Sequence, residues 1–234
     1  RGYVGEYTFS GALNINHKIY MGATFGINSV RYYEDIYHTE TDVNNLEPNI
    51  HSFRFREFNT TRGVGYNLKL GVLLKPIHIL RLGLAFHTPT LYQLTDEKFT
   101  DMTSSWDSDT GYPDEMSESR LYAKEYNLTS PLRASVSAAL LLARFGLVSA
   151  EYEYVDYSSA NLDSPGYKFF DENDAIQTAY KATHNLKAGA ELRLNPLYLR
   201  GGVQYYMSPY NDQRNGSDYW VYAAGLGVRS DNTY

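Results

Sequence analysis

Two kinds of residue alternate along this chain with a period of two, and the alternation is sustained over long stretches. Between 185 and 194 every even position is apolar, while the odd positions hold polar, charged or glycine residues. The same pattern recurs in 67–74, 81–87, 133–142 and 148–154. Such a period indicates a β-strand with two different faces, because successive side chains point to opposite sides. The sequence predicts nine strands, near 3–15, 19–34, 62–74, 78–93, 121–142, 146–157, 183–194, 197–207 and 218–229.

The connectors between these strands are short and long in strict alternation. The short connectors lie near 16–18, 75–77, 143–146 and 195–196, and the long ones span 36–61, 94–120, 158–182 and 208–217. Ordinary strands average about five or six residues, whereas membrane-barrel strands need about nine to eleven, with short turns on one side and longer loops on the other. The sequence therefore predicts an all-β fold, an antiparallel transmembrane β-barrel that forms one domain over 1–234, with the short turns on the periplasmic side.

The two faces of the predicted strands differ in chemistry. We expect one apolar face to meet lipid, through Leu68, Leu70, Leu82, Leu84, Val136, Leu140, Leu192 and Val203. The opposite face carries charges in mid-strand. A soluble sandwich would have to bury these charges, and a lipocalin-like binder would carry them on the outside of its barrel. We expect these charges to line a wet lumen: Glu6, Lys69, Arg81, His87, Arg133, Glu151, Glu153, Lys187, Glu191, Arg193, Arg200 and Arg229.

Tyrosine accounts for 23 of the 234 residues and gathers near the ends of the predicted strands. One cluster holds Tyr32, Tyr33 and Tyr37, and another holds Tyr205 and Tyr206. The rings are typical of the aromatic girdles at the headgroup level of a membrane barrel. Tyrosine is also a common strand residue in soluble sheets. The position of the clusters beside the connectors favours the girdle.

The composition excludes several classes of function. With 21 Lys and Arg against 27 Asp and Glu, the formal net charge is −6, which argues against nucleic-acid binding because little would neutralise the phosphates. The absence of cysteine excludes a disulfide scaffold, a Cys-ligated zinc site and a thiol nucleophile. No G-x-S-x-G or H-E-x-x-H motif occurs, and no acidic run has EF-hand spacing. We therefore expect no enzyme activity, no catalytic residue, no metal and no other cofactor.

One long connector contains a helical signal. Asp171 is a candidate N-cap, and apolar residues follow at Ala175, Ile176 and Ala179. This spacing predicts a short helix over 171–180 within the connector.

Several of these segments resemble a known family of membrane barrels. The runs G-Y-N-L-K-L-G-V-L-L-K-P at 65–76 and L-R-L-G-L-A-F-H-T-P at 80–89 are similar to segments of the FadL-type transporters of long-chain fatty acids and aromatic hydrocarbons. Further likeness lies in 132–137, 148–157 and the pair 199–203 and 223–228. The tyrosine-rich pattern is most similar to members from the Bacteroidetes.

The resemblance implies a fourteen-stranded outer-membrane barrel with an N-terminal plug, which admits hydrophobic molecules through long extracellular loops by passive diffusion. Nine strands would correspond to a middle stretch, so we expect the plug, several early strands and the last strands to be missing from this chain. Independently, nine strands do not close in the even-numbered way usual for such barrels, and an open edge in lipid leaves backbone groups unsatisfied. Both arguments predict that the working protein is longer.

Two groups of residues are candidates for ligand contact. Lys69, Arg81 and His87 have the fewest acidic neighbours on the predicted strands, so they are candidates for binding an anionic head group. Phe99, Trp106 and Tyr112 lie in a long, otherwise acidic connector and are candidates for a hydrophobic entry groove. The alternative is that these aromatic residues merely pack the connector against the barrel rim.

The remaining lumen charges form a predicted network of seven residues: Arg133, Glu151, Glu153, Lys187, Glu191, Arg193 and Arg200. Adjacent strands set Arg133 opposite Glu151 or Glu153, and Glu191 opposite Arg200. The network could guide a carboxylate ligand, but paired charges attract a ligand weakly, which favours a structural role.

Two functions stay open. The first is passive uptake of a small hydrophobic ligand such as a fatty acid, and the second is a structural or accessory barrel subunit of an outer-membrane complex. The expected partners are outer-membrane lipid or lipopolysaccharide, the hydrophobic ligand, and, for the second function, other outer-membrane subunits.

Overall fold

The computed structural model describes residues 1–44, 49–107, 110–212 and 216–228, and their fold is all-β and antiparallel, as predicted. The strands form one 13-stranded sheet, joined by one 3-10 helix (η1, Tyr157–Ser159) and one α-helix (α1, Phe170–Ala179). No helix in these ranges is long and apolar enough to span a membrane. The strands are β1 (Gly2–Ile15), β2 (Ile19–Thr41), β3 (Ile50–Ile77), β4 (Leu80–His87), β5 (Leu91–Trp106), β6 (Glu115–Glu118), β7 (Tyr122–Thr129), β8 (Arg133–Leu141), β9 (Gly146–Asp156), β10 (Asn161–Asp163), β11 (Ala182–Leu194), β12 (Leu197–Tyr206) and β13 (Tyr219–Val228).

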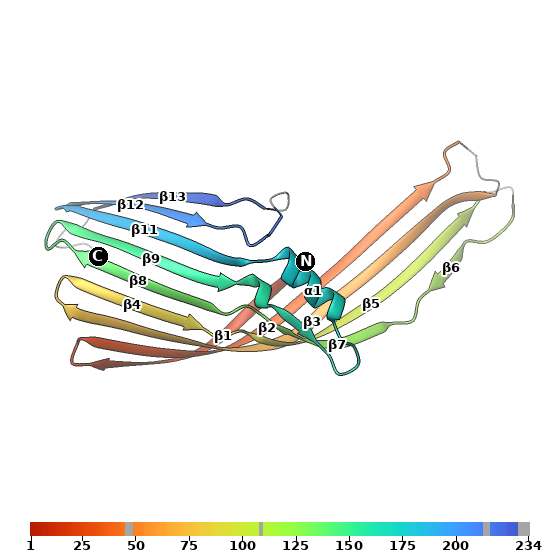
Figure 1. The fold of residues 1–234 in the computed structure, drawn as a ribbon. Coiled ribbons are helices and arrows are strands. Elements are labelled where there is room, and N and C mark those ends of the chain that lie inside the picture. The colour runs from red at the N-terminus through yellow and green to blue at the C-terminus, as the bar shows by residue number, and fades with distance from the viewer. Residues whose placement is uncertain (45–48, 108–109, 213–215, 229–234) are drawn as a thin grey trace. The chain divides into compact units, whose positions relative to one another are not determined.

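The chain divides into two compact units that share several of the long strands. Unit 1 comprises Arg1–Glu6, Asn28–Gly65 and Gln93–Asn127, and unit 2 comprises Tyr7–Ile27, Tyr66–Tyr92 and Leu128–Tyr234. Within unit 2 the strand order is β1-β2-β3-β4-β8-β9-β11-β12-β13, which keeps the order along the chain, although β5, β6 and β7 intervene between β4 and β8, and β10 between β9 and β11 (Figure 1). Each of these nine strands overlaps one of the nine predicted from the alternation, with the changes in bounds given below. Among the described residues the edges of this sheet are β1 and β13.

Four tight turns lie at one end of the unit 2 sheet. Between β1 and β2, the Lys18 N–H donates to Ile15 O over 3.0 Å, and Asn16 and His17 adopt positive φ angles. In the β8–β9 turn Gly146 has φ +146°, and a Cβ there would collide with the carbonyl oxygen of Glu191, so only glycine fits. Backbone hydrogen bonds between neighbouring turns, such as Lys75 N–H to Lys18 O at 2.7 Å, hold this end together.

One predicted turn was displaced. Residues 75–77 remain in β3, and the reversal occurs at 78–79 instead. Pro76 indicated a turn because it lacks an N–H, but the β3–β4 register shifts between Leu74 and Ile77, and such an irregularity accommodates proline in a strand. The predicted strand over 78–93 accordingly becomes β4, which ends before Pro89.

The connectors predicted at 36–61 and 94–120 are largely strand, not loop. β2 runs on to Thr41, β3 begins at Ile50, and β5 and β6 fill much of the second segment. The prediction was wrong because it took charged and polar composition as a loop signal. Alternating Phe, Arg, Thr and Glu pair well as strands when both faces of a sheet are wet.

Two smaller predictions also need correction. The predicted strand 121–142 is divided into β7 and β8 at 130–132, where Pro131 cannot donate to the ladder. The predicted helix is present as α1, but Asp171 is not its cap: Phe169 occupies the N-cap position, without a side-chain hydrogen bond. Asp171 lies in the first turn, where its negative charge still favours the helix dipole. Arg229 lies outside the described residues.

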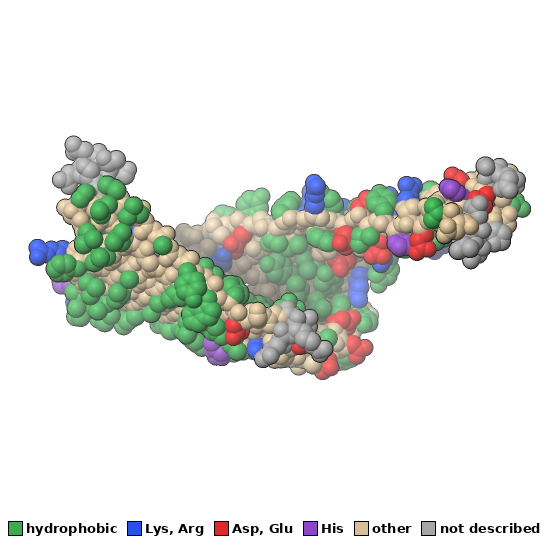
Figure 2. Space-filling model, turned by 90° about the horizontal axis from the view of Figure 1, so that it is seen from above, with side chains coloured by type: hydrophobic (Ala, Val, Ile, Leu, Met, Phe, Trp, Pro, Cys, Tyr) green, Lys and Arg blue, Asp and Glu red, His purple; other side chains and the backbone are tan. Residues whose placement is uncertain are grey.

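The two faces of unit 2 separate as the alternation predicted. On the apolar face Leu84 is 53% exposed and Val136 is 48% exposed, whereas on the charged face Glu153 is only 7% exposed. Buried apolar residues are rare: in the described chain they are Leu94, Val155 and Phe169. Figure 2 shows broad green hydrophobic areas on unit 2 and red acidic side chains recurring along unit 1. Unit 2 therefore leaves its apolar side chains exposed on one face, and its described residues form almost no apolar core.

Candidate functional site

The charged face of unit 2 begins with a row of three cationic or titratable side chains. Lys69 on β3 is the cross-strand partner of His87 on β4, and His87 is the partner of Arg133 on β8. Directly opposed residues project from the same face of a sheet. The structure therefore brings two of the predicted head-group residues together with one member of the predicted network.

Arg81, the third predicted head-group residue, lies elsewhere on the same face. It is six residues from His87 along β4, a separation of about 20 Å at about 3.3 Å per residue. Arg81 is exposed and has no ion pair among the described residues. Its cross-strand partner is Ala139. The three predicted head-group residues thus occupy two separate places.

Four residues of the predicted network and one amide form a continuous ion-pair cluster on β8, β9 and β11. Arg133 lies 3.4 Å from Glu153, and Lys187 lies 2.8 Å from Glu151 and 3.9 Å from Glu153. Asn185 donates its side-chain N–H to the buried Glu153 carboxylate at 3.0 Å. The expected pairing of Arg133 with a β9 glutamate is present. Each carboxylate has a cationic partner, as a structural network requires.

A second cluster centres on Glu191 near the tight-turn end. Its two carboxylate oxygens accept hydrogen bonds at 2.7 Å from the Nε atoms of Arg193 and Arg200. The expected pairing of Glu191 with Arg200 across β11 and β12 is therefore present. The cluster lines a cavity of about 410 Å³ together with Tyr198. Across both clusters four cations face three carboxylates, so a small positive excess remains.

Between the two clusters runs a row of unusually small side chains, defined here as the small-residue row. Directly paired positions on β8, β9, β11, β12 and β13 hold Ala139, Ser149, Gly189, Gly202 and Ala223. A cavity of about 540 Å³ lies over much of this row, with Arg81 at one end and the Glu151–Lys187 pair along one side. Sequence reasoning missed this row because it exists only once the register of five strands is known.

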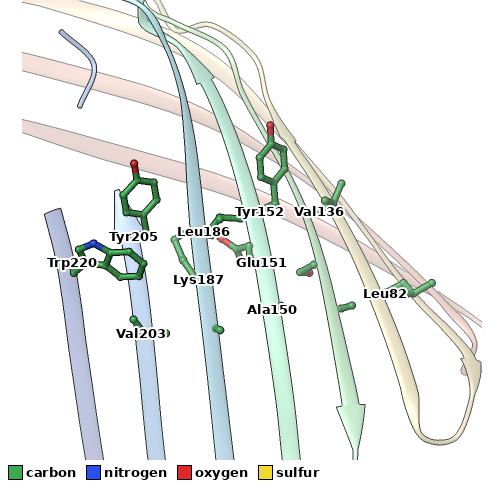
Figure 3. Close-up of a pocket in the computed structure, with 13 residues that line it drawn as sticks. Leu82, Val136, Ala150, Glu151, Tyr152, Leu186, Lys187, Val203, Tyr205 and Trp220 are labelled. Carbon is green, nitrogen blue, oxygen red and sulfur yellow. Dashed lines mark hydrogen bonds and ion pairs between the residues drawn. The ribbon is translucent and has the colours of Figure 1, made fainter. Parts of the chain in front are cut away.

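The apolar face carries a larger groove of about 880 Å³, shown in Figure 3. Alanines at 138, 150 and 188 are paired across β8, β9 and β11, which lowers the surface there. Tyr152, Tyr205 and Trp220 stand beside them on β9, β12 and β13. Tyr152 also hydrogen-bonds His184 through its hydroxyl at 2.6 Å. The groove is almost wholly apolar in its lining, so it fits a hydrocarbon chain rather than a polar molecule.

The predicted entry-groove residues belong to unit 1. Phe99 and Trp106 are half-buried on β5, and Tyr112 is exposed. The Trp106 and Tyr112 rings lie 5.7 Å apart at an angle of 59°. The Trp106 indole N–H is buried and has no hydrogen-bond partner in the described chain. Trp106 and Tyr112 thus form an aromatic pair, and this contact is compatible both with an entry groove and with simple packing.

Unit 1 is held by charged side chains that cross its strands. Arg56 donates to both carboxylate oxygens of Asp35 at 2.8 and 2.9 Å, lies 3.6 Å from the buried Asp101, and stacks on Tyr37 and Phe58. The Arg56 hydrogen bonds lower the pKa of Asp35. These contacts stabilise the polar ladder of unit 1 and leave Arg56 fully engaged.

Two further groups in unit 1 have shifted pKa values. Hydrogen bonds from Asn59 and then Lys98 lower the pKa of Glu57. Burial, together with the neighbouring Asp96 carboxylate, raises the pKa of Tyr126 to about 12. Among the described residues, no group of three or more His, Asp or Glu side chains is placed to hold a metal ion.

The fold is similar to that of a crystallised FadL homologue from Pseudomonas aeruginosa. The TM-score is 0.63, the sequence identity is 18%, and the match covers 98% of this chain but 56% of that one. The chain thus spans little more than half the length of that protein. No protein-family model and no curated protein matches the sequence. The likeness shows that the chain has a FadL-like β-barrel fold.

Proposed function

We propose that this protein is part of the wall of an outer-membrane β-barrel transporter that passes small hydrophobic molecules, such as long-chain fatty acids, by diffusion. The observation that carries the proposal is the two-faced sheet of unit 2: apolar side chains are exposed on one face, while ion pairs and cavities occupy the other. The FadL-like fold supports the same function.

In the proposed transporter the apolar face of unit 2 lies against the hydrocarbon of the outer membrane. Exposing Leu84, Val136 and their neighbours to water would forfeit about 25 cal/mol for each Å² of apolar area, whereas lipid removes that cost. The groove beside Tyr152 accepts a lipid acyl chain. The charged face then lines the wet interior.

The ligand travels along the charged face, and its carboxylate is met by Arg81. Within the described chain the guanidinium of Arg81 lies at the edge of the cavity over the small-residue row and has no ion pair. A carboxylate can accept two parallel hydrogen bonds from such a group. Lys69 and His87 are proposed to meet the same head group farther along the route. The paired network residues keep the interior polar without holding the ligand tightly.

Unit 1 is proposed to stand in water and to present the entry groove. Its side chains are mostly polar, and Phe99, Trp106 and Tyr112 are three of the aromatic side chains set among them. Aromatic surfaces of this kind can hold an alkyl chain by area burial before it enters the barrel. No nucleotide and no covalent step is needed for passage by diffusion.

Uptake by cells carrying the full-length protein tests the proposal. Arg81→Gln is expected to slow uptake of a labelled long-chain fatty acid severalfold but to leave uptake of the matching fatty alcohol unchanged, because the alcohol has no carboxylate. Lys168→Gln, an exposed cation in the segment between β10 and α1, is the matched control and should change neither.

Deletion of the gene separates the two functions left open by the sequence. Loss of fatty-acid uptake supports the transporter. If uptake of several fatty acids and alkylaromatics is unchanged while an outer-membrane complex loses integrity, the protein is an accessory barrel subunit and the transporter proposal is wrong.

A further inference from the structure

The end of unit 2 that carries the four tight turns is cationic. Lys18, Lys75 and Arg144 lie in or beside the turns, and His17 and His78 lie there as well. No Asp or Glu occurs within three residues of the turns at 16–18, 78–79, 142–145 and 195–196. We name this end the turn rim. In Figure 2 it shows blue and purple side chains among green ones.

Glu191 is the acidic residue of unit 2 that lies closest to the rim along the sequence, but it does not neutralise the cations of the rim. Glu191 is occupied by Arg193 and Arg200. Lys75 instead donates to the hydroxyl of Tyr20 at 2.9 Å and lies 4.2 Å from the centre of that ring, which leaves its charge uncompensated.

The other two cations of the rim are also without a carboxylate. Arg144 is exposed and stacks on the ring of its neighbour Phe145 at 5.2 Å, and Lys18 is exposed. Among the described residues neither has an ion pair with an acidic side chain. Three positive charges are therefore held close to one end of the sheet, and none has an acidic partner in the part of the chain that the structure describes.

Exposed apolar side chains accompany these cations. Phe145 is 58% exposed, and Ile15, Ile77, Ile79 and Leu142 are exposed beside the turns. An apolar side chain next to an unpaired cation is the arrangement of residues at a membrane–water boundary, where the apolar group enters hydrocarbon and the cation remains at the headgroups. The apolar face of unit 2 thus extends to the turns, where the cationic side chains of the rim follow it.

We propose that the turn rim binds the phosphate groups of anionic phospholipids in the leaflet next to the tight turns. Lys18 and Arg144 supply exposed charges and Phe145 supplies an interfacial ring, while Lys75, which is hydrogen-bonded to Tyr20, adds a third charge at the same end. The backbone hydrogen bonds that join neighbouring turns keep the cations in a fixed arc. The inference depends on the membrane placement of unit 2 given under the proposed function, but not on transport.

A lipid fits the rim better than an acidic protein does. An acidic protein could pair with the cations, but here Arg144 stacks on the exposed Phe145 and Lys18 precedes the exposed Ile19, at the end of a face that is proposed to lie in hydrocarbon. An anionic phospholipid matches the apolar side chains and the cations together, because its acyl chain covers the apolar groups while its phosphate binds the cation.

The test uses the full-length protein in nonionic detergent, titrated with phosphatidylglycerol or with phosphatidylcholine of the same acyl chains, and counts bound lipid by native mass spectrometry. The unaltered protein should retain phosphatidylglycerol in clear preference. The triple variant Lys18→Gln, Lys75→Gln, Arg144→Gln should lose at least about tenfold of that preference, since each cation near a headgroup contributes separately.

The matched control removes three exposed cations remote from the rim in sequence, Arg54→Gln, Arg120→Gln and Lys168→Gln. It should keep the preference. Circular dichroism verifies that each variant remains β-rich, and if the triple variant does not fold, Arg144→Gln alone should still give a smaller loss. The proposal is overturned if the rim variants keep the full preference, if the control loses as much, or if raised salt leaves the preference unchanged.

Discussion

Unit 1 and unit 2 share several long strands but differ in the side chains that those strands carry. Unit 1 carries eight Lys and Arg against sixteen Asp and Glu, while unit 2 carries thirteen against eleven. In unit 2 the charges sit on one face and the other face is apolar and exposed. In unit 1 charged pairs such as Arg56 and Asp35 hold the strands together. The two units therefore differ in what alternates along their strands, while the backbone pairing of a β-sheet is common to both.

The largest expected effect is a charge placed on the apolar face of unit 2. Val136→Arg, near the middle of β8, should cost about 2–4 kcal/mol of unfolding free energy in lipid vesicles, because a guanidinium in hydrocarbon is poorly solvated. Urea titration followed by tryptophan fluorescence measures it. Met102→Arg in β5 is the control: Met102 is 43% exposed in unit 1, and the change should stay within about 0.5 kcal/mol. Equal costs would abolish the distinction between the units.

A smaller effect is expected from close backbone packing in unit 1. A Cβ on Gly63 would collide with the carbonyl oxygen of Gln93 and lie 2.7 Å from the buried Leu94 side chain. Gly63→Ala should therefore destabilise unit 1 by about 1–3 kcal/mol, read from hydrogen exchange of β3 and β5. Gly5→Ala has open space around it and serves as the control. Equal exchange in both variants would show that the backbone around Gln93 accommodates the added methyl group of Gly63→Ala without loss of stability.

The smallest effect is a pH dependence confined to unit 1. The pKa of Asp35 and of Glu57 is lowered in the folded chain, so their contribution to stability is present above the ordinary carboxyl pKa of about 4 and is lost as the pH falls through the folded values. After correction for the pH dependence of intrinsic amide exchange, the protection of amides in β2 and β3 of unit 1 should fall on acidification from pH 7 to about 3. Peptides from β4 and β8, which contain no carboxylate, should change less. Asp35→Asn should weaken the effect, and a uniform response of all strands would contradict it.

The alternation in the sequence predicted nine strands, each of which overlaps a strand of unit 2. It also allowed the pairing of Arg133 with Glu151 or Glu153, and of Glu191 with Arg200, to be expected, because successive antiparallel strands set such residues side by side; the structure pairs Arg133 with Glu153. The strands of unit 1 were missed because strands rich in charged and polar side chains have the composition of a loop. The small-residue row could not be predicted, because it depends on the register of five strands. Ala139, Ser149 and Gly189 are far apart in sequence, and nothing local marks them as one row.

That row has a mechanical consequence. Bulky side chains on the concave side of a sheet resist bending, whereas glycine permits sharp local curvature. Gly189 and Gly202 face each other at the middle of the row, with alanine and serine on the neighbouring strands. The side chains along this line therefore offer the least steric resistance to curvature of the sheet. The space beside Arg81 owes its width to the same row, because Ala139, Ser149, Gly189 and Gly202 project no large side chain into it.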